Sequence, residues 1–271
     1  MNILEQIVAY KRKEVEERKA STPVAVLEKR AFFSRATLSL ADSLTDPGKT
    51  GIIAEFKRQS PSKGVINGQV RVVDVTRAYT SGGASCLSVL TDKPSFGGSS
   101  EDLQEARVNA IPILRKDFIV DEYQVAEAKA IGADVILLIA ACLRPAEVKK
   151  LAVLARSLGM EALLEIHGED ELDHICDETV LIGVNNRDLK TFTVDVERSI
   201  RLGRRIGSGK LLIAESGISR VETIVQMKAA GFHGFLIGEN FMKEQDPGKA
   251  FGRFVQQLAQ TGWTENANGI L

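Results

Sequence analysis

The chain has 271 residues, 44% of them apolar and 26% charged, and 35 basic residues nearly balance 36 acidic ones to give a formal net charge of −1. This composition supports a sizeable buried core, and the length suits a single domain over residues 1–271. The balanced charge argues against binding of nucleic acid or an anionic membrane through a broad basic surface. Any bound anion must therefore be held by a local site.

The N-terminal segment predicts helices rather than a secretory signal. Apolar residues from Ile3 to Val8 fall at helical spacing, and a strongly polar stretch follows them. We predict helices over residues 3–20 and 23–31, the second of which starts with a proline. Residues 1–48 are then a helical extension that covers either the bottom of the fold or part of its mouth. No apolar run approaches the ~18 residues of a membrane helix.

The rest of the chain repeats one pattern, which is a short apolar run, a polar turn, an amphipathic helix and a glycine. Each run has the length of a strand buried on both faces, as parallel sheets require. The runs span residues 51–57, 85–90, 111–116, 134–139, 161–166, 181–185, 211–215 and 234–237. Between them, Asp121 with Gln124 and Ser219 with Glu222 have capping-box spacing. Eight successive βα units favour an α/β protein built as one (βα)8 TIM barrel over an open doubly wound sheet.

Two polar segments stand outside this pattern. Residues 58–69 form the longest polar connection between elements, directly after the first strand, and we predict a mobile active-site loop there. The last stretch, residues 261–271, is polar and rich in small side chains, so we expect a fraying tail.

Cysteine and histidine usage gives no indication of a metal or redox centre. The three cysteines are Cys86, Cys142 and Cys176. They are far apart and odd in number, so we expect reduced core thiols in a cytoplasmic protein. The three histidines are His167, His174 and His233, and structural roles are favoured for them because they lack metal-ligand spacing. No dinucleotide fingerprint is present, and we predict an enzyme without cofactor or metal.

Ionisable and amide residues end several predicted strands, where barrel enzymes have their active sites. These residues are Glu55, Lys57, Lys116, Glu165, Asn185, Arg187 and Glu215. Glu55 and Lys57 are two residues apart, so a strand projects both to one face. A structural ion-pair network explains any one of these residues as well as catalysis does. For several strand ends together that explanation weakens, because burying many charges is costly unless function requires it.

The last two strand ends have a different character. Ser216-Gly217 and Gly238-Glu239 offer small residues and free backbone N–H groups. Loops at these positions bind phosphate in many barrels, often with a helix N-terminus. Simple turn chemistry is the alternative, and the paired location favours a phosphate site.

These motifs resemble the indole-3-glycerol-phosphate synthase family. The matching segments are residues 3–8, AEFKRQSPSKG at 54–64, LRKDF at 114–118, LEIH at 164–167, GVNNRDL at 183–189, AESGI at 214–218 and LIGE at 236–239. The resemblance extends to about residue 255. It implies ring closure, decarboxylation and dehydration of 1-(2-carboxyphenylamino)-1-deoxyribulose 5-phosphate to indole-3-glycerol phosphate, carbon dioxide and water in tryptophan biosynthesis.

The resemblance also implies roles for individual residues. The implied catalytic residues are Glu55, Lys57, Lys116, Glu165 and Asn185. The implied substrate-binding residues are Ser60, Phe96, Phe118, Arg187, Leu189, Glu215, Ser216, Gly217, Gly238 and Glu239. Lys116 acts as an acid or as an electrostatic stabiliser of the alkoxide formed on ring closure. The carboxylates and Lys57 share the later acid and base steps, with Asn185 as a neutral orienting partner.

The implied binding mode divides the substrate into three parts. Arg187 holds the carboxylate, Phe96, Phe118 and Leu189 wall the aromatic ring, and Ser60 with the last two loops holds the phosphate. Glu239 contributes only its backbone N–H there, so its side chain should point away. Two departures from the family pattern are Gln59, where alanine is usual, and Ser95-Phe96, where two aromatics are frequent.

Two other functions are less favoured. A related phosphate-binding barrel enzyme such as phosphoribosylanthranilate isomerase uses a cysteine and an aspartate at strand ends, and no cysteine ends a strand here. A non-catalytic sensor of a phosphorylated metabolite is expected to lose Lys57 and Lys116, and both are present. A monomer or weak homodimer is expected.

Overall fold

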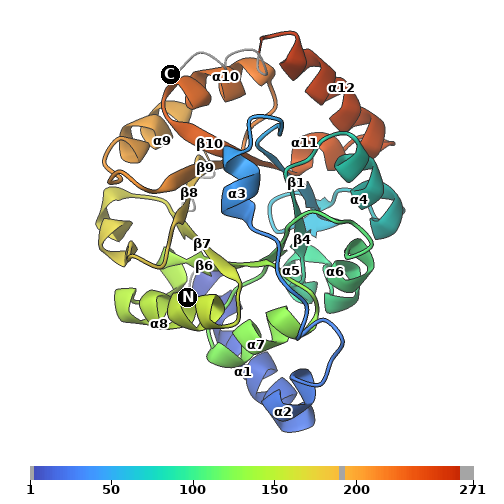
Figure 1. Ribbon diagram of the computed structural model, residues 1–271, viewed down its shortest axis with the longest axis vertical. Coiled ribbons are helices and arrows are strands. Elements are labelled where there is room, and N and C mark those ends of the chain that lie inside the picture. The colour runs from blue at the N-terminus through green and yellow to red at the C-terminus, as the bar shows by residue number, and fades with distance from the viewer. Residues whose placement is uncertain (1–2, 189–192, 263–271) are drawn as a thin grey trace.

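Eight parallel strands close into a barrel that is surrounded by helices (Figure 1). The computed structural model describes residues 3–188 and 193–262. The barrel strands are β1 (Ile52–Phe56), β4 (Cys86–Leu90), β5 (Ile113–Lys116), β6 (Val135–Ile139), β7 (Glu161–Ile166), β8 (Leu181–Asn185), β9 (Leu211–Glu215) and β10 (Phe232–Ile237). The predicted barrel is confirmed, and each predicted run holds one strand. Only β10 begins earlier than predicted, with a register shift between Phe232 and Gly234.

The helices between the strands start and stop where local signals direct. They are α4 (Val72–Ser81), α5 (Lys93–Phe96), α6 (Ser100–Ala106), α7 (Glu122–Ala130), η1 (Ala140–Cys142), α8 (Pro145–Ser157), η2 (Glu169–His174), α9 (Val196–Gly203), α10 (Val221–Ala229), α11 (Glu239–Met242) and α12 (Pro247–Ala259). Asp121 caps α7 as predicted, since its side chain accepts the Tyr123 N–H. The predicted cap at Ser219 is wrong: α10 begins after Arg220, and Ser219 lines a cavity instead.

The barrel interior follows the period of two along each strand. An apolar cluster fills its lower part, and four of its members are Ile53, Leu114, Leu163 and Ile213. Two residues further along, the same four strands carry Glu55, Lys116, Glu165 and Glu215. A strand projects residues i and i+2 to one face, so the charged side chains form the next layer, at the carboxyl end.

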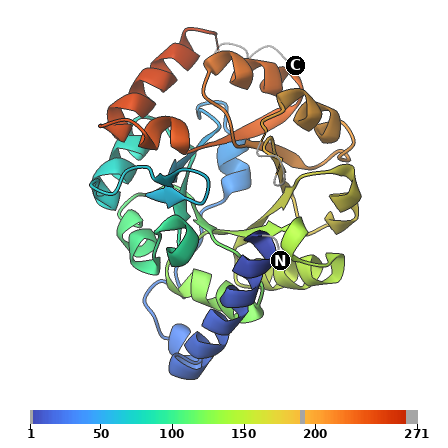
Figure 2. The ribbon, with the colours of Figure 1, turned by 180° about the vertical axis from the view of Figure 1, so that it is seen from behind.

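The N-terminal helices cover both ends of the barrel. The helices are α1 (Ile3–Ser21), α2 (Val24–Leu27) and α3 (Leu40–Thr45). Figure 2 shows the N-terminal end of α1 at the mouth, whereas α3 crosses the opposite end in Figure 1. Leu40 and Leu44 of α3 join the interior cluster, and Glu161 at the start of β7 accepts the Leu40 N–H at 2.6 Å. Both predicted locations are therefore occupied, although α3 was not predicted and the second helix is shorter than expected.

The polar segment after β1 folds back on itself. It contains the antiparallel pair β2 (Gln59–Ser60) and β3 (Gly64–Val65). Gly64 adopts a left-handed φ of 65° in the turn, which suits glycine. This hairpin crosses the mouth side of the barrel in Figure 2. The mobility predicted for it remains a prediction, and most of the predicted tail, residues 263–271, lies outside the described residues.

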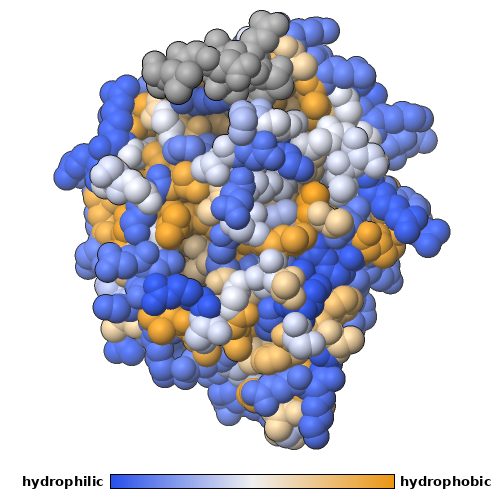
Figure 3. Space-filling model, viewed as in Figure 1, coloured by the Kyte–Doolittle hydropathy of each residue, from blue (hydrophilic) through white to orange (hydrophobic). Residues whose placement is uncertain are grey.

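The cysteines and the surface agree in part with the sequence. All three cysteines are free thiols, but only Cys86 is buried in the core, while Cys142 and Cys176 are half-buried. In Figure 3, hydrophobic residues appear in small groups between hydrophilic ones on the face that carries α3. None of the helices in the described part of the chain is long and apolar enough to cross a membrane.

Candidate active site

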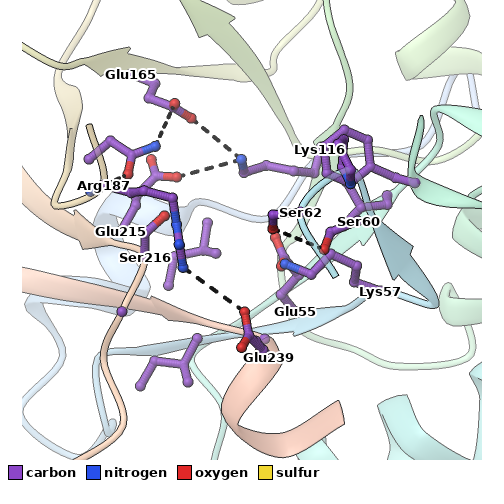
Figure 4. A pocket seen from close by; sticks show the side chains of 18 of the residues that line it. Glu55, Lys57, Ser60, Ser62, Lys116, Glu165, Arg187, Glu215, Ser216 and Glu239 are labelled. Atoms are coloured by element: carbon purple, nitrogen blue, oxygen red, sulfur yellow. Dashed lines mark hydrogen bonds and ion pairs between the residues drawn. The ribbon is translucent and has the colours of Figure 1, made fainter. Parts of the chain in front are cut away.

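A cavity of about 710 Å³ opens at the carboxyl ends of the barrel strands. All five predicted catalytic residues line it. Glu55, Lys57, Lys116 and Glu165 are labelled in Figure 4. Nine of the ten predicted substrate-binding residues line it too, and the tenth, Leu189, lies outside the described residues. The structure therefore brings together side chains that are as much as 184 positions apart, from Glu55 to Glu239.

Lys116 lies at the centre of the charged layer. Its Nζ is 3.4 Å from Oε2 of Glu165 and 3.6 Å from Oε2 of Glu215. Burial alone lowers the pKa of this ammonium, but Glu165, Glu215 and Glu55 outweigh it and raise the pKa above its usual value. Lys116 is therefore a fixed cation at neutral pH, and 17% of its side chain is exposed, toward the cavity.

The two carboxylates beside Lys116 differ in protonation. Burial raises the pKa of both, but Lys116, His167 and Asn185 hold the pKa of Glu165 well below its usual range. Burial together with the negative charge of Glu165 raises the pKa of Glu215 to about 8. At neutral pH the pair therefore consists of an ionised Glu165 and a protonated Glu215, an acid and a base in one layer.

A glycine on β8 makes room for Glu215. A Cβ added at Gly183 would collide with Oε1 of Glu215. That oxygen is buried and has no hydrogen-bond partner among the described residues. Since no alanine fits here without displacing the carboxyl group, Gly183 is part of the site. Its inward position on the strand is the sequence signal that the motif analysis did not use.

Asn185 fixes the orientation of Glu165. Its Nδ2 donates to Oε1 of Glu165 at 2.9 Å, and its Oδ1 accepts the Arg187 N–H at 3.0 Å. The amide is thus held at both ends, and its NH2 group must face the carboxylate. This arrangement matches the neutral orienting role expected for Asn185.

Glu55 and Lys57 form a second charged pair across the cavity. Oε1 of Glu55 lies 2.6 Å from Nζ of Lys57, and Glu55 is 4% exposed. Gly238 packs directly on this pair, because a Cβ there would lie 2.9 Å from Cβ of Glu55. Gly238 therefore also serves to seat Glu55, which sequence reasoning had not anticipated.

The apolar wall has contributors that the sequence did not single out. Phe96 and Phe118 approach with ring centroids 6.1 Å apart and planes inclined by 38°. The further lining side chains are Ile3, Leu4 and Ile7 of α1, Leu90 of β4, and Leu137 and Ile139 of β6. Alternation along β6 marks Leu137 and Ile139 as inward-facing, but the contribution of α1 depends on how that helix docks.

The loop after β9 has the backbone expected of an anion site. Ser216 and Gly217 adopt consecutive left-handed φ values of 67° and 70°. Among the described residues, Ser216 is the only non-glycine with positive φ, a conformation that costs about 1–3 kcal/mol. Asn186 donates to the Ser216 carbonyl at 2.8 Å and holds the turn. Further polar lining residues, which the sequence analysis missed, are Ser62, Ser219, Asn240 and Lys243.

The Glu239 side chain does not point away as expected, because its carboxylate lies between two cations at the rim of the cavity. Its carboxylate is 4.0 Å from Nη2 of Arg187 and 3.9 Å from Nζ of Lys63 (Figure 4 shows the contact with Arg187). The Arg187 guanidinium thus faces a carboxylate across the cavity.

No group of three or more His, Cys, Asp or Glu side chains suited to a metal ion occurs within residues 3–188 and 193–262.

A sequence model described as indole-3-glycerol phosphate synthase matches residues 4–254. The indole-3-glycerol phosphate synthase of Bacteroides thetaiotaomicron is 45% identical over 258 residues, which cover 95% of this chain and 99% of the relative. That of Chromobacterium violaceum is 45% identical over 262 residues, covering 93% and 97%. Among solved structures, tryptophan synthase subunit alpha from Legionella pneumophila aligns with a TM-score of 0.61 at 14% identity, covering 85% of this chain and 100% of the other. That last similarity concerns the fold alone.

Proposed function

Because the chain belongs to the indole-3-glycerol phosphate synthase family of decarboxylating lyases in tryptophan biosynthesis, we propose that its cavity binds and converts 1-(2-carboxyphenylamino)-1-deoxyribulose 5-phosphate through the residues described above. The observation that carries this proposal is the layer of Lys116, Glu165 and Glu215, a cation between an ionised and a protonated carboxyl group. The protein works in the cytoplasm as a monomer or weak homodimer.

The binding mode follows from the chemistry of the walls. The phosphate binds between Ser60 and the backbone of Ser216 and Gly217. Backbone N–H donors hold it there, because the chain as a whole carries no net positive charge that would attract an anion. The aromatic ring lies against Phe96 and Phe118. Arg187 exchanges its contact with Glu239 for the substrate carboxylate, which it can grip with two hydrogen bonds.

Ring closure places a negative charge on the former ketone oxygen. Lys116 stabilises this alkoxide as a preorganised cation, since its raised pKa makes it a poor proton donor but a permanent charge. The protonated Glu215, 3.6 Å from the Lys116 Nζ, supplies the hydrogen bond or proton that the oxygen requires. The ring carbon that attacked the ketone still carries the carboxylate, and the ring has become an iminium-type electron sink. Carbon dioxide therefore leaves, and the ring regains its aromaticity, without help from a cofactor.

Dehydration needs an acid for the departing hydroxide and a base for rearomatisation. Lys57, paired with Glu55 at 2.6 Å, is the cation on the opposite wall and suits the acid role. Of the two carboxyl groups beside Lys116, Glu165 is the one that is ionised at neutral pH, so we assign it the base role. The two groups face the substrate from different strands, which lets acid and base steps run in one cavity.

Replacement of Lys116 tests this proposal directly. Purified protein incubated with the substrate should develop indole fluorescence, and Lys116→Ala should lower kcat by about 10²-fold or more while substrate Kd changes little. The matched control is Lys150→Ala on the surface of α8, where the side chain is 65% exposed. An inactive wild type, or a Lys116→Ala variant that keeps more than about a tenth of kcat, would contradict the assignment.

A further inference from the structure

One titratable group behind the cavity has no place in the chemistry above. His167 follows β7, its side chain is 13% exposed, and it is absent from the lining of the cavity. Its Nε2 lies 3.2 Å from Oε1 of Glu165, and its Nδ1 lies 3.5 Å from Oε2 of Glu171 on η2. Neither nitrogen makes a well-aligned hydrogen bond, so the contact is one of charge between an imidazole and two carboxylates.

We propose that His167 is a positioning residue, a buried imidazolium that holds the Glu165 carboxylate from behind and keeps it ionised, with Glu171 as its counter-ion. The inference rests on the proposed function, because it assigns His167 a purpose through Glu165. Glu171 and His167 lie behind Glu165 and outside the lining of the cavity, so they do not contact the substrate.

The two oxygens of Glu165 have different partners. Oε1 accepts a hydrogen bond from Nδ2 of Asn185 at 2.9 Å and lies 3.2 Å from Nε2 of His167. Oε2 lies 3.4 Å from Nζ of Lys116. With two partners behind it, the carboxylate cannot turn Oε2 away from Lys116 without losing both. His167 therefore acts on which oxygen is presented to the cavity as well as on its charge.

Glu171 ties the imidazole to the backbone. Its Oε2 accepts a hydrogen bond from the backbone N–H of His167 at 2.6 Å, and the same oxygen lies 3.5 Å from Nδ1 of the ring. The carboxylate is 14% exposed, so it connects the buried pair to the surface. A single side chain on η2 thus fixes both the backbone and the ring of His167.

The charges from the other packed elements favour a protonated imidazole. Burial lowers the pKa of His167, but Glu165 and Glu171 outweigh it and raise the pKa to about 10. Glu215 on β9 is protonated at neutral pH, and the Cys142 thiol on η1 has a pKa raised by burial to about 12, so neither adds a competing charge. On the other side of Glu165, the cation in contact with its carboxylate is Lys116 on β5.

The test combines variants with an NMR measurement of the protonation of the His167 ring. His167→Gln keeps a neutral donor, His167→Phe keeps the volume, and Glu171→Gln removes the counter-ion. Glu169→Gln is the matched control on the same η2 segment, because Glu169 is 60% exposed and pairs with Arg205. Thermal unfolding confirms that each variant is folded.

We expect His167→Phe to lower kcat by about 10-fold or more with KM changed less than about threefold, and to move the acidic limb of the kcat–pH profile upward. His167→Gln should restore part of kcat but not the position of the limb. Glu171→Gln should not move the limb upward, because the His167 ring is still protonated at the low pH where Glu165 titrates, and Glu169→Gln should leave the profile unchanged.

Imidazole NMR on the resting protein separates this inference from the proposed function. The wild-type His167 ring should remain protonated at pH 8 and titrate near 10, and Glu171→Gln should lower that pKa. A ring that titrates near its ordinary 6.5, or a His167→Phe enzyme with wild-type kcat and acidic limb, overturns the inference even if indole forms. A wild type that forms no indole overturns the proposed function while the NMR result stands by itself.

Discussion

At the residue scale, the site depends on how one barrel layer divides its charges. Lys116 compensates Glu165, and Glu215 remains protonated because burial and the negative charge of Glu165 raise its pKa. Gly183 and Gly238 complete the layer by leaving space for Glu215 and Glu55. Each of these glycines would be interpreted from sequence as a turn or strand residue, yet its missing Cβ leaves the space that a carboxyl side chain of the charged layer occupies.

The protonated Glu215 predicts a pH-dependent stability. Its pKa rises from 4.5 when unfolded to about 8 when folded, so in that window the folded state binds the extra proton. The free energy of unfolding should therefore fall as pH rises from 4.5 to 8, and Glu215→Gln should flatten this dependence. Denaturant titrations at several pH values measure it.

The catalytic counterpart is a basic limb in the kcat profile of the wild type near pH 8 that is absent in Glu215→Gln. A variant with an unchanged limb, or an unfolding free energy with the same slope as the wild type, would show that Glu215 is ionised in the native protein.

At the element scale, α1 is joined to the barrel mouth by a buried charge. Lys11 is 0% exposed, and its Nζ lies 2.8 Å from Asp92 and 3.1 Å from Asp117, the residue after Lys116. The two acids raise the pKa of Lys11 above its usual value despite its burial. Because the first turn of α1 lines the cavity, this contact couples the position of the helix to the shape of the site.

Lys11→Met should therefore destabilise the protein by about 3–5 kcal/mol, since it removes the cation beside the buried Asp92 and leaves Asp117 with Arg115 alone. It should also raise KM, because a loosened α1 opens the apolar wall. Urea unfolding and steady-state kinetics measure the two effects. Lys13→Met, at a position 82% exposed on the same helix, is the control and should change neither. Equal effects of both substitutions would show that helix propensity, and not the buried ion pair, is responsible.

The loop after β9 gives a second prediction at this scale. Gly217→Ala should raise KM by about 10-fold or more, because Gly217 belongs to the loop where we expect the phosphate to bind. An alanine there would be strained at a φ of 70°, and its Cβ would collide with the Val194 side chain. Gly231→Ala is the matched control, with a φ of 93° and open space around it. Inorganic phosphate should compete with substrate in the wild type and in Gly231→Ala, but poorly in Gly217→Ala. An equal rise of KM in both variants would refute a specific role of this loop.

At the scale of the whole molecule, closure of the barrel assembles the site. The strands pair in the order β1-β10-β9-β8-β7-β6-β5-β4, so β1 and β10, at opposite ends of the chain, become neighbours. Their register pairs Ala54 with Ile237, which places Glu55 beside Gly238. The residues that we propose to bind the phosphate and to transfer protons therefore share one rim, although they come from distant parts of the sequence.

Turnover is expected to need no metal, and chelation tests this for the complete protein. The expectation comes from the chemistry of the substrate, which forms its own electron sink, and from donors that are all side chains or backbone N–H groups. Activity should be unchanged after dialysis against excess EDTA. Activity that EDTA abolishes and a divalent cation restores would contradict the expectation.

The sequence alone was enough to predict the barrel, its eight strands and the set of residues at their carboxyl ends. It could do so because strand length, apolar runs and helix punctuation are local properties, and because a period of two determines which residues share a face. The layer of Glu55, Lys116, Glu165 and Glu215 above the apolar cluster follows from that period once the barrel is assumed.

Only the tertiary structure decided how these residues act on one another. Three features depend on distances across the barrel. They are the protonation of Glu215, the contact of His167 with Glu165, and the buried contact of Lys11 with Asp92 and Asp117. A pKa in a buried site is set by burial and by the nearest charges, and those neighbours come from other strands and helices. Local sequence identifies the ionisable groups, whereas packing fixes their separations and so decides which of them carries a proton.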